Sequence, residues 1–296
     1  MLRILGWIAS SILIWCSCEP PIRVRVADKS TQRDSVHYVG IAENKSDVDL
    51  RKAKLLGTVK VGDRGATLDC RYPDVLDYAR RNAGRIGGNL MVIIKHRRNE
   101  VKSNCHVIKA EVYHVASLEG MESRMYWHPE RRLAIKDLRG SPPPTNTTAL
   151  PPLYTLLTCW LGGDFFKEAF IRTETLFFPD SAGLPTAPPA AAIALRRAQL
   201  HFDLTEIYAR RLKVALLAIG PNLEALVGRY RAQTEEYLLQ LRQEQAHLDA
   251  ELSSSADPDA VLARWESDIQ ERLLALAPYA GHQRVDLRKT KRPKDR

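Results

Sequence analysis

Several common catalytic and binding motifs are missing from this 296-residue chain. There is no Gly-x-Ser-x-Gly, which would form the nucleophile elbow of a serine hydrolase, and no Gly-x-x-x-x-Gly-Lys-Ser/Thr phosphate-binding loop. Cysteine is scarce, with five residues and no Cys-x-x-Cys pair to suggest a redox or structural zinc site. These absences argue against serine-hydrolase, nucleotide-binding and thiol-redox functions.

The N-terminus carries an export signal. Arg3 precedes an apolar run from Ile4 to Trp15 that is too short for a membrane span, which needs about 20 residues, but fits a secretory signal peptide. Ser17 supplies the small residue that bacterial lipoprotein signals place before the lipidated cysteine, so residues 1–18 resemble such a signal, with Cys18 as the acylated N-terminus. An uncleaved anchor and an ordinary signal peptide are the alternatives. In each case the chain leaves the cytoplasm, and we expect it in the bacterial envelope, facing the periplasm or the exterior.

Three cysteines remain outside the signal. In an oxidising envelope Cys70 and Cys105 can form a disulfide, which leaves Cys159 free or buried.

The net charge of +9 is concentrated at the C-terminus, where residues 284–296 hold seven Lys or Arg and two Asp. We predict that residues 281–296 are a basic disordered tail. Because we expect the chain to be exported, we predict that this tail keeps the protein soluble or contacts anionic lipid or cell-wall polymer. We do not expect it to bind nucleic acid.

Residues 19–34 are polar and predict a tether, and residues 35–118 predict a small α/β envelope domain. Leu56-Gly57 on the first strand and the turn Gly87-Gly88-Asn89 after the helix resemble envelope domains of the Rcs stress-sensor lipoprotein type. Lys95 to Arg98 predicts a solvated turn of a hairpin. The expected elements are a strand at 55–61, a helix at 73–86, and strands at 90–94 and 107–115.

The second part of the chain predicts strands followed by helices. Together with the first unit this gives an α+β fold class, and no internal repeat is evident. The expected elements are strands at 155–160 and 165–178, a helix that contains His201, and helices at 221–250 and 258–277.

The helix around His201 carries an incomplete zinc-protease motif. His-Glu-x-x-His needs two histidines four residues apart on one helix face, and a glutamate beside the first to deprotonate the metal-bound water. Here His201 takes the second histidine position, Arg197 the first, and Ala198 replaces the glutamate.

The flanking sequence resembles a bacterial family of predicted secreted zinc-dependent proteases. The resemblance covers roughly residues 122–280, and implies a zincin-like domain whose opening strand is at 126–133. Ser254 stands nearest to the position where the family carries a downstream histidine, a candidate third ligand. With Arg197, Ala198 and Ser254 at these positions, the resemblance implies a domain that has lost its metal chemistry and has neither catalytic residues nor bound metal. His201 is then the residual candidate ligand. The matching segments are 126–133, 137–143, 200–212 and 249–254, together with Trp265.

The helical periodicity gives the same picture. His201 lies on a largely apolar face, where a lone histidine is more often a hydrogen-bonded core residue than a ligand. Arg197 lies one turn away and would repel a dication unless its guanidinium extends outward. Asp203, Glu206 and Arg210 fall on another face, where ion pairing along the helix is expected. The apolar face comprises Ala194, Arg197, His201, Leu204, Thr205, Tyr208, Leu212 and Ala215.

We therefore predict a non-catalytic envelope lipoprotein that binds a protein, peptide or envelope polymer and needs no cofactor. The alternative is a zinc-dependent metallohydrolase with an unusual ligand set. A structural or assembly factor that docks through its long charged helices is a third possibility. Candidate ligands for the enzyme are His128, His201, His247, Glu206 and Glu251.

Overall fold

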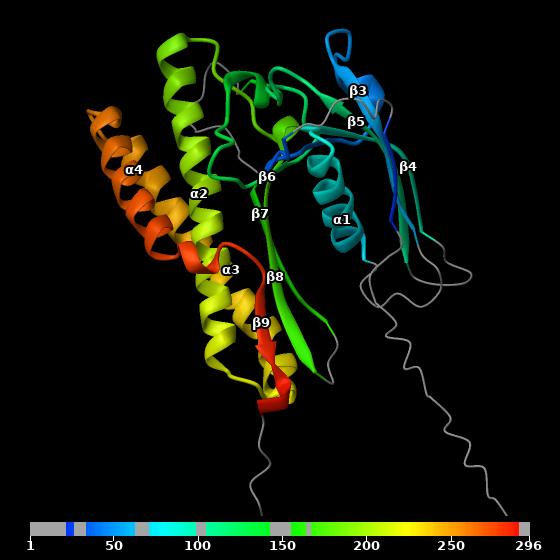
Figure 1. The fold of residues 1–296 in the computed structure, drawn as a ribbon. Helices are drawn as coiled ribbons and strands as arrows, with labels where there is room; N and C mark the ends of the chain where they lie inside the picture. Colours follow the sequence, from blue (N-terminus) through cyan, green and yellow to red (C-terminus); the bar gives the residue numbers. More distant parts are fainter. Residues whose placement is uncertain are drawn as a thin grey trace, which may run out of the picture.

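The computed structural model describes residues 22–26, 34–62, 71–98, 105–142, 155–163 and 167–289. Within these residues the protein is a mixed α+β fold with two sheets and four α-helices, as the sequence predicts (Figure 1). The predicted signal peptide, Cys18 and Cys70 lie outside the described residues. Cys105 takes part in a disulfide. Its pairing with Cys70 stays a prediction, because Cys70 is not among the described residues. Cys159 is free, and burial raises the pKa of its thiol to about 11.

The first sheet has five strands in the order β1-β3-β5-β4-β2. β2 pairs with β4 in parallel, and the other pairs are antiparallel. Helix α1 covers one face of this sheet and lies between the two sheets (Figure 1). The elements are β1 (Ile22–Val26), β2 (Gly40–Ala42), β3 (Lys54–Val61), α1 (Tyr72–Arg85), β4 (Leu90–Arg98) and β5 (His106–His114).

Helix α1 begins and ends within one residue of the predicted bounds, 73–86. Pro73 stands in its first turn, where a missing N–H costs nothing. Val75 and Ala79 are fully buried on the face towards the sheet. Gly87 has φ +79°, a conformation that glycine adopts without strain, and it turns the chain into β4.

Two predictions for the first sheet are wrong. Residues 22–26 are not tether but the edge strand β1, whose alternation of valine and arginine is that of a strand with one polar face. Residues 95–98 are not a turn, because β4 continues through them to Arg98. A bulge between Ile93 and Lys95 shifts the register, and the strand stays paired with β5.

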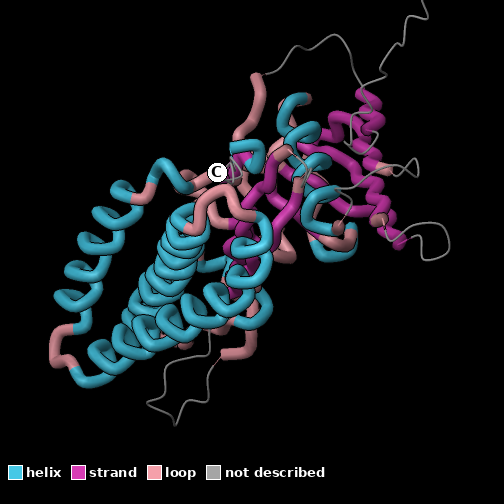
Figure 2. Tube along the Cα trace, turned by 90° about the horizontal axis from the view of Figure 1, so that it is seen from below, coloured by secondary structure: helices cyan, strands magenta, loops and turns pink. Residues whose placement is uncertain are grey.

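The second sheet has the order β6-β8-β7, with β9 on β8, and three long helices pack against it. Figure 2 shows these helices side by side on one side of the strands. The elements are β6 (Met125–Tyr126), β7 (Thr155–Gly162), β8 (Glu168–Phe177), α2 (Pro188–Ala218), α3 (Leu223–Ser254), α4 (Pro258–Ala275) and β9 (Gln283–Asp286); five short 3-10 helices complete the set, at Lys45–Asp47, Ile135–Asp137, Pro179–Ser181, Ala277–Tyr279 and Leu287–Lys289.

The predicted disordered tail begins too early. Residues 283–286 form β9, which pairs with β8. Val285 and Leu287 are buried in the core around α2, and these two apolar side chains hold the segment despite its charge.

The predicted opening strand at 126–133 is also too long. Only Met125 and Tyr126 form β6, and a loop follows. Arg131 holds this loop by donating to Glu122 and Asp137, each at 2.8 Å.

Helix α2 is buried on all sides between residues 197 and 210, because it is the middle layer between the sheet and helices α3 and α4. The predicted ion pair of Glu206 and Arg210 is present, with 2.7 Å between Nε and Oε1, but it lies in the interior. Asp203 forms its ion pair with Arg132 of the loop after β6, and it also accepts hydrogen bonds from Trp127 and from Gln199 one turn earlier on α2.

The two predicted domains share apolar contacts. Tyr126 and Leu176 of the second part pack into the core beneath α1. Ile41 and Arg124 also form a β-bridge between the parts. None of the described helices has the length and apolar character needed to cross a membrane.

Candidate functional site

The residues of the predicted incomplete motif, Arg197, Ala198 and His201, lie on α2 where it meets α3. Arg197 and His201 are both buried, with 4 % and 6 % of their surfaces exposed. Both side chains reach the carboxylate of Asp249 on α3. Ala198 faces the other way and packs with Phe202 and Met125 in an apolar cluster.

Asp249 is the centre of this arrangement. Its Oδ1 accepts from Nε of Arg197 at 2.6 Å and contacts Nε2 of His201 at 2.8 Å, and its Oδ2 accepts from Nη2 of Arg197 at 2.7 Å. Burial opposes ionisation, but these hydrogen bonds prevail and hold the pKa of Asp249 at about 2. An ionised carboxylate only accepts, so Nε2 of His201 carries the proton.

His201 is therefore the hydrogen-bonded core histidine that its apolar face predicts. Burial lowers its pKa, so the ring is neutral at pH 7. Arg197 does not extend outward; its guanidinium stays inside, in a two-pronged ion pair.

The structure does not bring Ser254 to this place. Ser254 is exposed in the last turn of α3, where its hydroxyl donates to the carbonyl of Ala250 at 2.9 Å. It lies five residues beyond Asp249, which places it on another face of the helix. Asp249 could have been recognised from its position between Leu248 and Leu252, which mark the buried face of α3.

The other candidate ligands are dispersed. His247 and Glu251 contact each other at 3.2 Å on the outer side of α3, where Glu251 also binds Arg264. His128 and Glu206 lie elsewhere, in a cavity described below. Within the described residues no group of three or more His, Cys, Asp or Glu side chains is placed to hold a metal ion.

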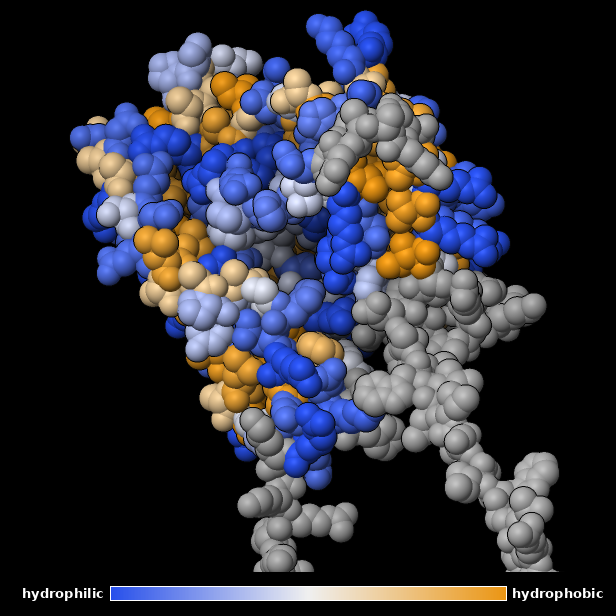
Figure 3. Space-filling model, viewed as in Figure 1, coloured by the Kyte–Doolittle hydropathy of each residue, from blue (hydrophilic) through white to orange (hydrophobic). Residues whose placement is uncertain are grey.

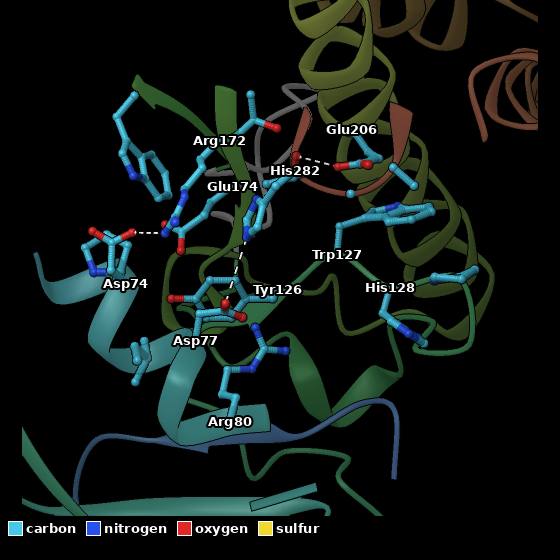
Figure 4. A pocket seen from close by; sticks show the side chains of 18 residues that line it. Asp74, Asp77, Arg80, Tyr126, Trp127, His128, Arg172, Glu174, Glu206 and His282 are labelled. Atoms are coloured by element: carbon cyan, nitrogen blue, oxygen red, sulfur yellow. Dashed lines mark hydrogen bonds and ion pairs between the residues drawn. The ribbon is translucent and has the colours of Figure 1, made fainter. Parts of the chain in front are cut away.

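Many charged and aromatic side chains line a cavity of about 450 Å³ between the two parts of the fold (Figure 4). α1, β6, β7, β8, α2 and the segment before β9 all contribute to its walls. The side chains relevant to its chemistry are Asp74, Asp77, Arg80, Tyr126, Trp127, His128, Trp160, Arg172, Glu174, Glu206 and His282.

Most charges in the cavity are paired with a neighbour. Arg172 donates to Asp74, and His282 lies 3.9 Å from Asp77 on the facing helix. Burial opposes ionisation of Asp77, but the contacts with His282 and nearby arginines lower its pKa. Arg80 stacks over the ring of Tyr126 at 4.4 Å.

Glu206 is held by two partners, as its Oε2 accepts from Thr175 at 2.8 Å and its Oε1 from Arg210 at 2.7 Å. Lys213, buried two turns beyond Glu206 on α2, donates to the carbonyls of Ala280 and Gly281 at 3.3 and 3.1 Å. This lysine therefore fixes the segment that closes one side of the cavity. Burial lowers its pKa to about 8.

Two of the residues that line the cavity carry a polar group without a hydrogen-bond partner among the described residues. No hydrogen bond or ion pair with another described residue engages the carboxyl of Glu174, and burial raises its pKa to about 7, with Asp77 and Asp74 adding to the shift. Nε1 of Trp160 is buried and, among the described residues, has no acceptor. Near pH 7 the carboxyl of Glu174 can donate or accept a hydrogen bond, whereas the indole N–H of Trp160 can only donate.

Sequence reasoning did not identify this cavity. Its residues come from segments far apart in the chain, and no spacing links them. The local signal is the pair Arg172 and Glu174, two charged residues in the middle of strand β8.

A scan against protein-family models and searches of curated proteins and of solved structures find no match to this chain.

Proposed function

We propose that this protein is a bacterial envelope lipoprotein whose C-terminal part keeps a zincin-like scaffold without its metal chemistry and serves as a binding module. The observation that carries the proposal is the guanidinium of Arg197, which lies against Asp249 beside His201. An imidazole in place of that guanidinium would complete a set of two histidines and one carboxylate, which is a common zinc ligand set.

Arg197 opposes metal binding in two ways. Its positive charge repels a dication at close range in a medium of low polarity. It also donates to both oxygens of Asp249, while Nε2 of His201 directs its proton at Oδ1, so a metal between His201 and Asp249 would have to displace these hydrogen bonds. Arg197 and His201 thus tie α2 to α3 through Asp249.

The cavity offers the binding surface of the proposed module. Glu174 and Trp160 provide uncommitted hydrogen-bonding groups, and the rings of Tyr126 and Trp127 provide apolar walls. Such a mixture suits a ligand that carries hydroxyl or amide groups, as an envelope peptide or polymer does.

Zinc binding by the Arg197→His variant tests the proposal. We expect wild-type protein to retain no stoichiometric zinc after dialysis, and Arg197→His to bind about one zinc per chain, because three ligands then converge. The variant Arg196→His is the matched control, since Arg196 points to Glu266 and Asp259 on α4. Wild-type protein that retains zinc and cleaves casein would overturn the proposal.

The runner-up is a zinc-dependent hydrolase with another ligand set, and one observation favours keeping it. His128 and Glu206, two of its candidate ligands, line the same cavity as Glu174. Zinc content that falls in a His128→Ala variant and not in His201→Ala would support this hydrolase. To bind zinc, Glu206 would first have to break its hydrogen bonds with Thr175 and Arg210.

A further inference from the structure

Four lysine and arginine residues lie side by side across the outer face of the five-stranded sheet. The register pairs Arg23 with Lys60, Lys60 with Lys109, and Lys109 with Lys95, so one cation from each of four adjacent strands falls on a single row. Adjacent strands are about 4.8 Å apart, so the row spans roughly 14 Å. All four side chains are exposed.

Two more cations border this row. Arg25 lies two residues beyond Arg23 on β1, and Arg97 two residues beyond Lys95 on β4, so both face the same side as the row. We call these six residues the basic face: Arg23, Arg25, Lys60, Lys95, Arg97 and Lys109. They line two adjacent hollows of about 460 and 310 Å³.

The basic face is not neutralised within the described part of the chain. No ion pair joins any of its six residues to a described carboxylate. Glu111, the next outward residue on β5 after Lys109, is bound to Lys45 at 2.9 Å and to Tyr113 at 2.5 Å. Like charges directly opposite each other on neighbouring strands destabilise a sheet, so this row costs stability that packing does not require.

No described element covers the basic face. Helix α1 packs on the opposite side of the sheet (Figure 1), and hydrophilic side chains form the right-hand margin of Figure 3, beyond a band of hydrophobic ones. The apolar cluster of Leu90, Val92 and Tyr113 is on the same side as the basic face but at the other end of the strands, where residues 45–53 and 118–121 pack on it.

We propose that the basic face binds the anionic phosphate headgroups of a membrane. The choice of a membrane rests on the envelope location in the proposed function. The predicted acylated Cys18 lies four residues before Ile22, so the bilayer would be within roughly 14 Å of the start of β1. The two hollows are sites that phosphate groups can enter between cationic side chains.

Vesicle binding by the chain 19–296 tests this proposal without the acyl group. This chain keeps every strand and helix of the described structure. We expect it to sediment with vesicles that contain 30 % phosphatidylglycerol, and not with phosphatidylcholine vesicles. Because each cation near an anionic surface strengthens binding about fivefold, the double variant Lys60→Glu/Lys109→Glu should bind at least ~25-fold more weakly.

The matched control is Arg229→Glu/Arg231→Glu, which changes the charge equally on exposed residues of α3. It should bind the vesicles nearly as well as the wild type. The melting temperature of Lys60→Glu/Lys109→Glu should be unchanged or higher, since the row of like charges is broken, so misfolding is distinguished from lost binding.

Three results would overturn the proposal: no binding to phosphatidylglycerol vesicles, equal loss in the control, or binding only to soluble polyphosphate. The last would assign the basic face to a polymer instead. A membrane-bound protein with an inert basic face would leave the lipoprotein proposal intact, so the two failures are distinguishable.

Discussion

A single carboxylate, Asp249, determines what the incomplete motif can do. It accepts hydrogen bonds from two cationic or polar partners on α2 and joins that helix to α3. Local spacing predicts that His201 is buried and hydrogen-bonded, and the structure confirms it. The partner could not be predicted, because it lies 48 residues away on another helix and periodicity carries no information on how helices are paired.

The pKa of Asp249 makes a pH-dependent prediction. The folded state holds this pKa at about 2, below the ordinary 3.8, so its contribution is complete above roughly pH 5 and is lost as the pH falls through 2. We expect Asp249→Asn to lower the free energy of unfolding by about 2 kcal/mol at pH 7, and by much less at pH 2. Urea unfolding at both pH values measures this.

The variant Asp268→Asn is the control for this experiment. Its carboxylate pairs with Arg272 along α4 but is 54 % exposed, so the loss should stay within about 0.5 kcal/mol. An equal loss for the two variants, or a loss at Asp249 that is the same at pH 2 and pH 7, would contradict the role given to Asp249.

At the scale of elements, long periodic segments were predicted well and short edge segments were not. Helices α1, α3 and α4 lie within a few residues of their expected bounds. Strands β1 and β9 have five and four residues, and their charges resemble those of a tether or tail. Such strands owe their structure to the neighbouring strand, which is a long-range effect. The burial of α2 could not be predicted for the same reason, because charged residues of this helix, such as Arg197, Asp203 and Lys213, are buried by contacts with partners on other elements.

A substitution in β9 tests whether this strand is part of the fold. Val285 is 7 % exposed and contacts the core around α2, whereas Arg284 points outward. Val285→Asp should lower the free energy of unfolding by about 3 kcal/mol, because it buries an unpaired charge and removes apolar contacts. Arg284→Ala should change it by less than about 1 kcal/mol. Equal denaturant midpoints for the two variants would show that residues 283–286 do not pack.

On the scale of the whole molecule, two modes of membrane attachment combine in the proposed lipoprotein. One is the predicted acyl group on Cys18, and the other is the basic face. Salt separates them, since the screening length falls to about 3 Å at 1 M and an acyl chain is unaffected. Neither the row of cations nor the cavity could be predicted, because strand register and the meeting of the two parts are not local properties.

Membrane fractionation of Cys18→Ser is the corresponding prediction. Wild-type protein should resist a wash with 1 M NaCl and need detergent for release. Mature-length Cys18→Ser protein should be released by the same wash, since only the electrostatic attachment remains. Wild-type protein that salt alone removes would show that Cys18 is not acylated.

The pairing of β9 with β8 also sets the order in which the molecule can be completed. A chain that emerges from its N-terminus can form the five-stranded sheet early, because every strand of that sheet lies before residue 115. The cavity has to wait for the final segment, whose carbonyls bind Lys213 and whose His282 approaches Asp77. A nascent or prematurely terminated chain would therefore present the basic face while still lacking one wall of the cavity. In such a chain the proposed membrane contact would form before the proposed binding cavity was complete.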